Sequence, residues 1–294
     1  LQHREGLWLL GRRARRMSVK LLGPAEIRDL AELLDVTPTK KLGQNFVIDA
    51  NTVRKIVKVA HVEAGDSVVE IGPGLGSLSL GIVEAGASLV AVEIDGRLAA
   101  QLPATFAEMA PEAKLTVIHE DAMKIMELPD EPTRLVANLP YNVSVPVLLH
   151  FLEHFPSIRS GVVMVQAEVG HRLAAEPGSK IYGGPSAKAA WYGKWRIAGN
   201  VSRQVFWPVP NVDSVLVGFE RDAVQPGDEA LRRRTFDIID GAFGQRRKML
   251  RQALSDLCGS SAAATELLER AGIDPTLRGE QLNIAQFVSI ANAS

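Results

Sequence analysis

The sequence predicts an α/β fold: a parallel sheet with helices on both faces, followed by a small all-helical domain. Short runs rich in Val and Ile alternate with helical patterns from about residue 50 to residue 168, which is typical of strand–helix–strand units. After a polar hinge that contains Pro226 and Gly227, the pattern is helical to the last residues. These two observations indicate the fold class and divide the chain into domains.

The elements are expected in the following order. A helix with Pro in its first turn covers residues 24–34, a loop with Pro, Gly and Asn covers 35–49, and a helix follows at 50–60. The strands of the parallel sheet are expected at residues 67–71, 88–94, 115–121, 134–138 and 161–168. The helices between them are expected up to about residue 84, around residues 96–109 and at residues 145–155. Two final strands, within 197–207 and at 214–220, have no helix between them.

The composition is that of an ordinary globular protein. The chain has 294 residues, of which 46% are hydrophobic and 23% charged, and its net charge is −1, so a nucleic-acid partner would have to be met by local basic patches. The single cysteine, Cys258, excludes an intramolecular disulfide and a four-cysteine zinc site, and we expect a buried apolar thiol in a reducing compartment. Since no apolar run approaches the roughly 20 residues that span a bilayer, we expect a cytoplasmic protein with no membrane partner.

The N-terminus is expected to lie outside the fold. The apolar piece "LWLL" is too short for a signal peptide and its arginines follow it, while Met17 just downstream suggests that residues 1–16 reflect an ambiguous translation start. We therefore expect a flexible basic arm at 1–23, a sheet domain at 24–220 and a helical domain at 221–294 that binds RNA.

Polar and glycine residues follow four successive strands at the point where each strand ends. The first strand is followed by "GPGLG", which contains Gly72 and Gly74; the next ends at Glu93, the third at Asp121 and the fourth at Asn138. In an open parallel sheet the ligand binds outside the carboxyl ends of the strands. The sequence therefore predicts one binding site that these residues share.

The acids indicate which kind of ligand fits. A nicotinamide cofactor is disfavoured because the third glycine comes one residue too early for G-x-G-x-x-G. Glu93 is placed to bind both ribose hydroxyls and Asp121 to bind an adenine amino group, although a surface position and a helix cap remain the alternatives. Two acids without a Lys or Arg at the phosphate position fit a nucleoside that carries a positive charge, such as S-adenosylmethionine.

The stretch "NLPY" suggests chemistry on an adenine amine. That amine is a poor nucleophile because its lone pair is delocalised into the ring. Acceptors at Asn138 Oδ1 and the Leu139 carbonyl would draw the nitrogen towards tetrahedral geometry, Pro140 would stiffen the turn, and Tyr141 would stack on the base for about 1–3 kcal/mol. The alternative is an ordinary Asn-x-Pro turn. Phe206, or else Trp207, would supply a second wall for a flipped base, with a hydrophobic plug between domains as the alternative.

Positive charge gathers in the helical domain. Residues 231–251 carry a net charge of +5, in a pattern that would suit RNA phosphates or a solvated helix face. The residues expected to bind RNA are Arg246, Arg247, Lys248 and Arg251. His150 and His154 stand four apart, but without H-E-x-x-H or a third ligand we expect no metal site.

Taken together, these motifs resemble the small-subunit (16S) rRNA adenine N6,N6-dimethyltransferase family over about residues 24–290. The resemblance rests on "KKLGQNFVID", "EIGPGLGSL", "VEID", "HEDAM", "NLPYNVS", "MVQAEVGHRLAAEPGSKIYGGPS", "FWPVPNVDS" and "FGQRRKMLRQAL". It implies a Rossmann-like methyltransferase sheet and transfer of two methyls to each of two adjacent adenines near the 3′ end of small-subunit rRNA. The donor would be S-adenosylmethionine, the partner a pre-30S particle and the enzyme a monomer.

The resemblance also implies roles for single residues. Donor contacts would come from Asn45, Val47, Gly72, Gly74, Glu93, Asp121 and Asn138. The base would be held by Asn138, Leu139, Pro140, Tyr141 and Phe206. Val209 departs from the family's three consecutive prolines. The alternatives are a macrolide-resistance enzyme of large-subunit rRNA, which the long helical C-terminus disfavours, and a largely non-catalytic nucleic-acid-binding factor.

Overall fold

The computed structural model describes residues 18–36, 45–140 and 142–294. The strands are β1 (Phe46–Val47), β2 (Ser67–Ile71), β3 (Ser88–Glu93), β4 (Leu115–His119), β5 (Arg134–Asn138), β6 (Ser160–Gln166), β7 (Gly193–Val201), β8 (Phe206–Trp207) and β9 (Ser214–Arg221). The helices are α1 (Pro24–Leu33), α2 (Ala50–Val59), α3 (Ser77–Glu84), α4 (Gly96–Met109), α5 (Ser144–His154), α6 (Ala167–Leu173), α7 (Gly184–Tyr192), α8 (Glu229–Gly244), α9 (Leu250–Ala253), α10 (Ser255–Cys258), α11 (Ser261–Arg270) and α12 (Ile284–Ala293). Two 3₁₀ turns, η1 (Arg203–Val205) and η2 (Gly279–Gln281), complete the described elements.

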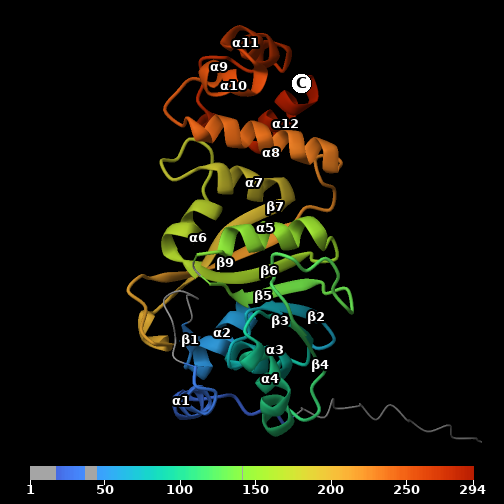
Figure 1. Cartoon of the computed structure of the whole chain (residues 1–294), viewed down its shortest axis with the longest axis vertical. Helices are drawn as coiled ribbons and strands as arrows, with labels where there is room; N and C mark the ends of the chain where they lie inside the picture. The colour runs from blue at the N-terminus through green and yellow to red at the C-terminus, as the bar shows by residue number, and fades with distance from the viewer. Residues whose placement is uncertain (1–17, 37–44, 141) are drawn as a thin grey trace, which may run out of the picture.

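One mixed sheet organises the molecule. Within the described residues its seven strands follow the order β4-β3-β2-β5-β6-β9-β7, and the five strands from β4 to β6 run parallel. Figure 1 shows an elongated molecule with α1 at one end, the sheet in the middle and α8 to α12 at the other end. The α/β fold class predicted from the sequence is confirmed.

Both faces of the sheet are buried, which explains why its strands are continuous apolar runs. Adjacent residues point to opposite faces, so Val68 packs with α2 and α3 while Val69 packs towards α5, and both are fully buried. A parallel sheet needs this double cover because its crossover helices lie on both sides.

The late strands differ from the sequence prediction. The expected strand within 197–207 is two elements, since β7 ends at Val201 and Ser202 caps the 3₁₀ turn that precedes β8. β9 runs antiparallel to both β6 and β7. The expected loop at 35–49 contains β1, which forms a two-stranded antiparallel ribbon with β8.

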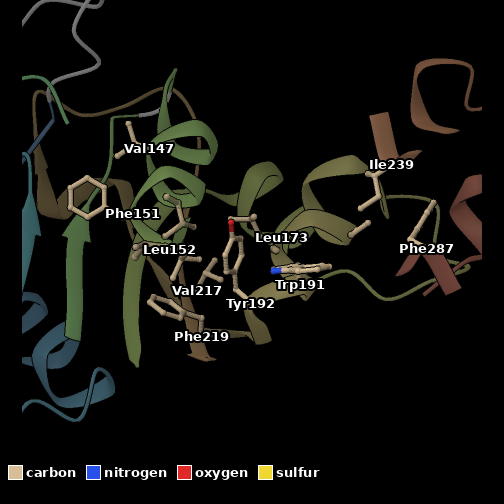
Figure 2. Close-up of a cluster of buried hydrophobic side chains, with 14 of the residues drawn as sticks. Val147, Phe151, Leu152, Leu173, Trp191, Tyr192, Val217, Phe219, Ile239 and Phe287 are labelled. Carbon is tan, nitrogen blue, oxygen red and sulfur yellow. The ribbon is translucent and has the colours of Figure 1, made fainter. Parts of the chain in front are cut away.

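The C-terminal helices pack on the sheet domain through α7. One hydrophobic cluster runs from Phe151 of α5 through Trp191 of α7 to Ile239 of α8 and Phe287 of α12, all at most 2% exposed. Figure 2 shows these side chains spread from α5 across the sheet and α7 to the C-terminal helices. The helical C-terminus and the sheet therefore share a core.

Residues 18–23, which were expected to belong to a flexible arm, pack against the fold. Leu22 is buried in the core, and the Lys20 N–H donates to the Met109 carbonyl at 2.9 Å, so residues 18–23 pack at the end of α4. Residues 1–17 lie outside the described residues. None of the described helices combines the length and the apolar character needed to cross a membrane.

Candidate active site

A cavity of about 330 Å³ opens at the carboxyl ends of β2, β3, β4 and β5. Its wall contains the residues that follow each of these strands, as the sequence predicts. Of the predicted site residues, it is lined by Asn45, Val47, Gly72, Gly74, Glu93, Asp121, Asn138, Leu139 and Pro140. Tyr141 lies outside the described residues.

The turn after β2 brings bare backbone to the cavity. Gly72 and Gly74 both have left-handed backbone angles, with φ of 69° and 58°, a conformation that glycine adopts at little cost. A Cβ on Gly74 would lie 2.9 Å from Cε1 of Phe46, too close for any side chain. The Gly72 N–H donates to the Val92 carbonyl at 2.8 Å and holds the turn against β3. Conformation and space therefore both favour glycine at position 74, whereas conformation alone favours it at position 72.

Glu93 is held in one orientation by main-chain donors. Its Oε2 accepts the Gly74 N–H at 3.0 Å and its Oε1 accepts the Asp95 N–H at 2.9 Å. The side chain is only 5% exposed, and burial raises the pKa of its carboxyl. The carboxylate is thus fixed at the cavity wall before any ligand binds.

Asp121 caps a turn and also lines the cavity. Its Oδ1 accepts the Met123 N–H at 2.9 Å, which caps the turn after β4. The same side chain lines the cavity and is half-buried. The capping bond therefore positions a carboxyl that also faces the site.

The turn after β5 is tied to two neighbouring segments. Asn138 donates from Nδ2 to the Asn45 carbonyl at 3.0 Å, and the Leu139 N–H donates to the Met164 carbonyl at 3.0 Å. Because Nδ2 points towards the Asn45 carbonyl, the Oδ1 atom of Asn138 points away from it. The Pro140 carbonyl accepts the Val143 N–H at 3.3 Å and closes the turn.

Phe206 differs from its predicted position. It is 1% exposed and belongs to the hydrophobic core, outside the cavity wall that the described residues form. The reason is strand alternation: Phe206 pairs with Val47, so its ring lies on the face of the ribbon opposite Trp207. Trp207 stacks on Phe46, a cavity-lining ring, with centroids 6.4 Å apart.

Glu70 is a cavity residue for which the sequence suggested no role. It is 1% exposed, lines the cavity, and accepts a 2.5 Å hydrogen bond from Ser79 Oγ on α3. Burial raises the pKa of its carboxyl to about 8. Sequence reasoning missed it because a glutamate at the end of an apolar strand looks like one more strand-end acid. Phe46, Ile94 and Met123 also line the cavity.

Of the basic residues predicted to bind RNA, Arg246, Arg247 and Lys248 lie in the turn between α8 and α9 and Arg251 lies in α9, and none of them lines the cavity. Arg247 and Lys248 are exposed and Arg251 is half-buried. Arg246 is engaged in an ion pair with Glu280, at 2.8 Å between Nε and Oε2. Within the part of the chain that the structure describes, Arg246 is therefore ion-paired, while Arg247, Lys248 and Arg251 are not.

Comparison with known proteins places these features in a family. The family model for ribosomal RNA adenine dimethylase matches residues 37–294. The chain is 70% identical to "Ribosomal RNA small subunit methyltransferase A" of Leifsonia xyli subsp. xyli over 275 residues, 93% of this chain and 98% of that protein. It is 59% identical to the protein of the same name from Corynebacterium efficiens over 277 residues, 92% and 96% of the two chains.

Solved structures share the fold at low sequence identity. A dimethyladenosine transferase from Plasmodium falciparum aligns with a TM-score of 0.70 and 22% identity, over 82% of this chain and 94% of that one. The 23S rRNA methyltransferase ErmE aligns with a TM-score of 0.64 and 23% identity, over 85% and 99%. At this identity the likeness supports the Rossmann-like methyltransferase fold.

Proposed function

The chain belongs to the ribosomal RNA adenine dimethylase family, and from that premise we propose which of its residues carry the reaction. Its relatives identify it as an rRNA adenine dimethyltransferase that acts on small-subunit rRNA. The proposal concerns the donor, the cavity residues and the assembly state. The observation that carries it is that the Glu93 carboxyl and the Asn138–Pro140 turn line one cavity.

The cavity residues fit S-adenosylmethionine as the methyl donor. Glu93, fixed by two main-chain N–H groups, suits the two ribose hydroxyls, and Asp121 suits the adenine amino group. Gly72 and Gly74 leave room for the ligand to approach the backbone, while Asn45 and Val47 lie across the cavity. When bound, the donor supplies a methyl carbon attached to a positively charged sulfur.

The turn after β5 would prepare the target amine. Asn138 Oδ1 and the Leu139 carbonyl accept hydrogen bonds from the two amine N–H groups and draw the nitrogen towards tetrahedral geometry, which frees its lone pair. The nitrogen loses its proton after the methyl group has been transferred. Pro140 restricts the backbone that presents them. Preorganised acceptors of this kind act on the transition state without further reorganisation. Tyr141 is proposed to stack on the base.

The second wall of the base pocket needs a revised assignment. Since Phe206 is buried behind the β1–β8 ribbon, the aromatic group beside the cavity is the Phe46–Trp207 stack. We propose that Trp207 or Phe46 contacts the base in the geometry described, and that Phe206 does so only if β8 turns over on binding. Mutating each ring singly and measuring KM for the RNA distinguishes these cases.

The protein is proposed to act as a cytoplasmic monomer on a pre-30S particle. The sheet domain, residues 18–220, would hold donor and base, while residues 221–294 would contact rRNA. Sedimentation of the protein alone, and with small subunits, tests the monomeric state and the partner.

The function is tested with labelled donor and unmethylated small subunits, followed by mapping of the modified bases. We expect label on N6 of two adjacent adenines near the 3′ end, and Glu93→Ala should weaken donor binding by calorimetry. Label on large-subunit rRNA would instead support the macrolide-resistance reading. An absence of transfer to either subunit would contradict the proposed function.

A further inference from the structure

The loop at residues 174–183, between α6 and α7, is fastened to the C-terminal segment. The Gly178 N–H donates to the Glu280 carbonyl at 2.7 Å. Further along, the Tyr182 hydroxyl, on a side chain only 2% exposed, donates to the Leu282 carbonyl at 2.9 Å. The loop is therefore attached at two points to residues about 100 positions away in the sequence.

Arg246 adds a third attachment and links three segments with one side chain. Its Nε pairs with Glu280 Oε2 at 2.8 Å, and its Nη2 donates to the Lys180 carbonyl at 2.6 Å. A guanidinium presents its donors in a rigid fork, so these two bonds fix its plane. An RNA phosphate would have to displace Glu280 to gain the same contact. Arg246 is better placed to hold the loop than to bind phosphate.

The fastened loop brings exposed cations together. Lys180 lies on the loop, while Arg247 and Lys248 directly follow Arg246, and all three are exposed. Among the residues described, none of these three forms an ion pair. The loop also carries one exposed acid, Glu176, so the surface has a net positive charge.

This surface begins close to the candidate active site. α6 starts directly after β6, and β6 pairs with β5 so that Met164 lies opposite Asn138. The seven residues of α6 span about 10 Å at 1.5 Å per residue. If one base of an RNA strand lies in the cavity, neighbouring nucleotides of the same strand can therefore reach the loop at residues 174–183.

We propose that residues 174–183 and 245–249 form one RNA-contacting surface, in which Lys180 contacts phosphate and the Arg246–Glu280 pair holds the loop in place. The proposal rests on the proposed function, since it names where the same rRNA lies outside the cavity. It changes the predicted role of Arg246 from phosphate contact to positioning residue. It also adds a loop of the sheet domain to the contacts expected from the C-terminal helices alone.

The contact is tested with Lys180→Ala and the binding of in vitro transcribed small-subunit rRNA over a series of salt concentrations. We expect a loss of affinity of about 3–10-fold and a decrease of about one in the salt slope, as for one lost phosphate contact. The matched control is Lys58→Ala, an exposed lysine in the last turn of α2, which packs on the face of the sheet opposite to α6 and α7. Equal behaviour of the two variants would overturn the assignment of Lys180.

The positioning role of the Arg246–Glu280 pair is tested by whether mutation of Glu280 weakens or tightens RNA binding. Removing an acid should tighten RNA binding if only charge matters. If the pair holds the loop, Glu280→Ala should weaken binding about 3–10-fold, raise KM for the small subunit, leave kcat and donor affinity unchanged, and speed amide exchange at Gly178. Glu280→Gln can still accept the Arg246 N–H and should restore wild-type affinity. Tighter binding by both variants would overturn this role.

Failure of the proposed function and failure of the proposed RNA-contacting surface give different results. If the wild-type protein transfers no methyl group to small subunits, the proposed function itself is wrong. If it transfers methyl groups normally while Lys180→Ala and Glu280→Ala bind rRNA like the wild type, only the composite surface is wrong.

Discussion

The side-chain amide of Asn138 makes one observed hydrogen bond and is proposed to make a second one with the target amine. Its Nδ2 donates to the Asn45 carbonyl at 3.0 Å, which leaves Oδ1 as the acceptor proposed for the target amine. Asn138→Ala removes both functions. We expect methyl transfer to fall by about 10²–10³-fold, the range found when one preorganised hydrogen-bonding group is removed from an active site. Single-turnover transfer to small subunits measures this loss.

The prediction for Asn138 requires that folding and donor binding persist. Calorimetry should still detect donor binding, at an affinity reduced by the loss of the Asn138 contact, since Glu93 and Asp121 remain, and the unfolding midpoint in urea should stay close to wild type. Asn200→Ala, on an exposed residue of β7, is the matched control and should retain wild-type transfer. Near-normal turnover by purified Asn138→Ala would contradict the proposed mechanism.

Glu70 predicts a pH dependence of stability. Its pKa is raised to about 8 in the folded protein, mainly by burial, from 4.5 as the ordinary value. Between these values the native state holds a proton that the unfolded state has released, so the contribution of Glu70 is full below pH 4.5 and is lost as the pH rises towards 8. Glu70→Gln should remove this dependence.

The test for Glu70 compares the free energy of unfolding of both proteins in urea at several pH values. The wild type should lose stability relative to Glu70→Gln by on the order of 1 kcal/mol per pH unit across that window. A constant difference between the two proteins would mean that Glu70 ionises at its ordinary pKa.

Single residues of the site differ in how far the sequence predicts them. Glu93, Asp121 and Asn138 were found from their positions at strand ends, because parallel strands deliver their carboxyl ends to one edge. The face on which the Phe206 ring lies was not predictable, because it depends on how the two-residue strand β8 pairs with β1. The buried state of Glu70 depends on α3 packing, which no local pattern encodes.

Among the elements, α8 is joined to α5 by a half-buried ion-pair network. Arg232, whose side chain is 10% exposed, contacts Glu153 at 2.6 Å and Glu229 at 2.7 Å. Removing one partner of such a network leaves uncompensated charge. We expect Arg232→Ala to lower the free energy of unfolding by about 2–3 kcal/mol, as measured in urea.

The neighbouring arginine provides the control for this element. Arg233 also pairs with Glu229, at 2.6 Å, but its side chain is 72% exposed. Solvent screens such a pair, so Arg233→Ala should change the free energy of unfolding by no more than about 0.5 kcal/mol. Equal losses in the two variants would mean that burial of Arg232 does not matter.

Among the elements, the strands of the parallel sheet were predictable from the sequence, whereas the β1–β8 ribbon and the short helices α6 and α7 were not. β2 and β5 match their expected ranges because each is a continuous apolar run between turn residues. The β1–β8 ribbon joins segments about 160 residues apart with two residues from each strand, so no local periodicity marks it. α6 and α7, with seven and nine residues, are likewise too short for a helical pattern to stand out.

At the scale of the whole molecule, the shared core decides whether the C-terminal helices are independent. One hydrophobic cluster includes side chains of the sheet together with Trp191 of α7, Ile239 of α8 and Phe287 of α12 (Figure 2). A surface that is buried only when both parts are folded couples their unfolding. The polar hinge expected at residues 221–230 therefore separates two patterns in the sequence, but it does not separate two independent cores.

Phe287→Ala tests this coupling, because Phe287 is fully buried on α12. We expect a loss of about 3–5 kcal/mol in the free energy of unfolding, whereas Phe287→Leu, which nearly conserves volume, should cost less than about 1.5 kcal/mol. Native-state hydrogen exchange followed separately in β5 and α8 should show both elements destabilised together by the alanine variant. Loss of protection in α8 alone, with β5 unchanged, would mean that the helices open as a separate unit. The RNA surface proposed across residues 174–183 and 245–249 would then depend on the Arg246–Glu280 pair and its neighbouring hydrogen bonds instead of the common core.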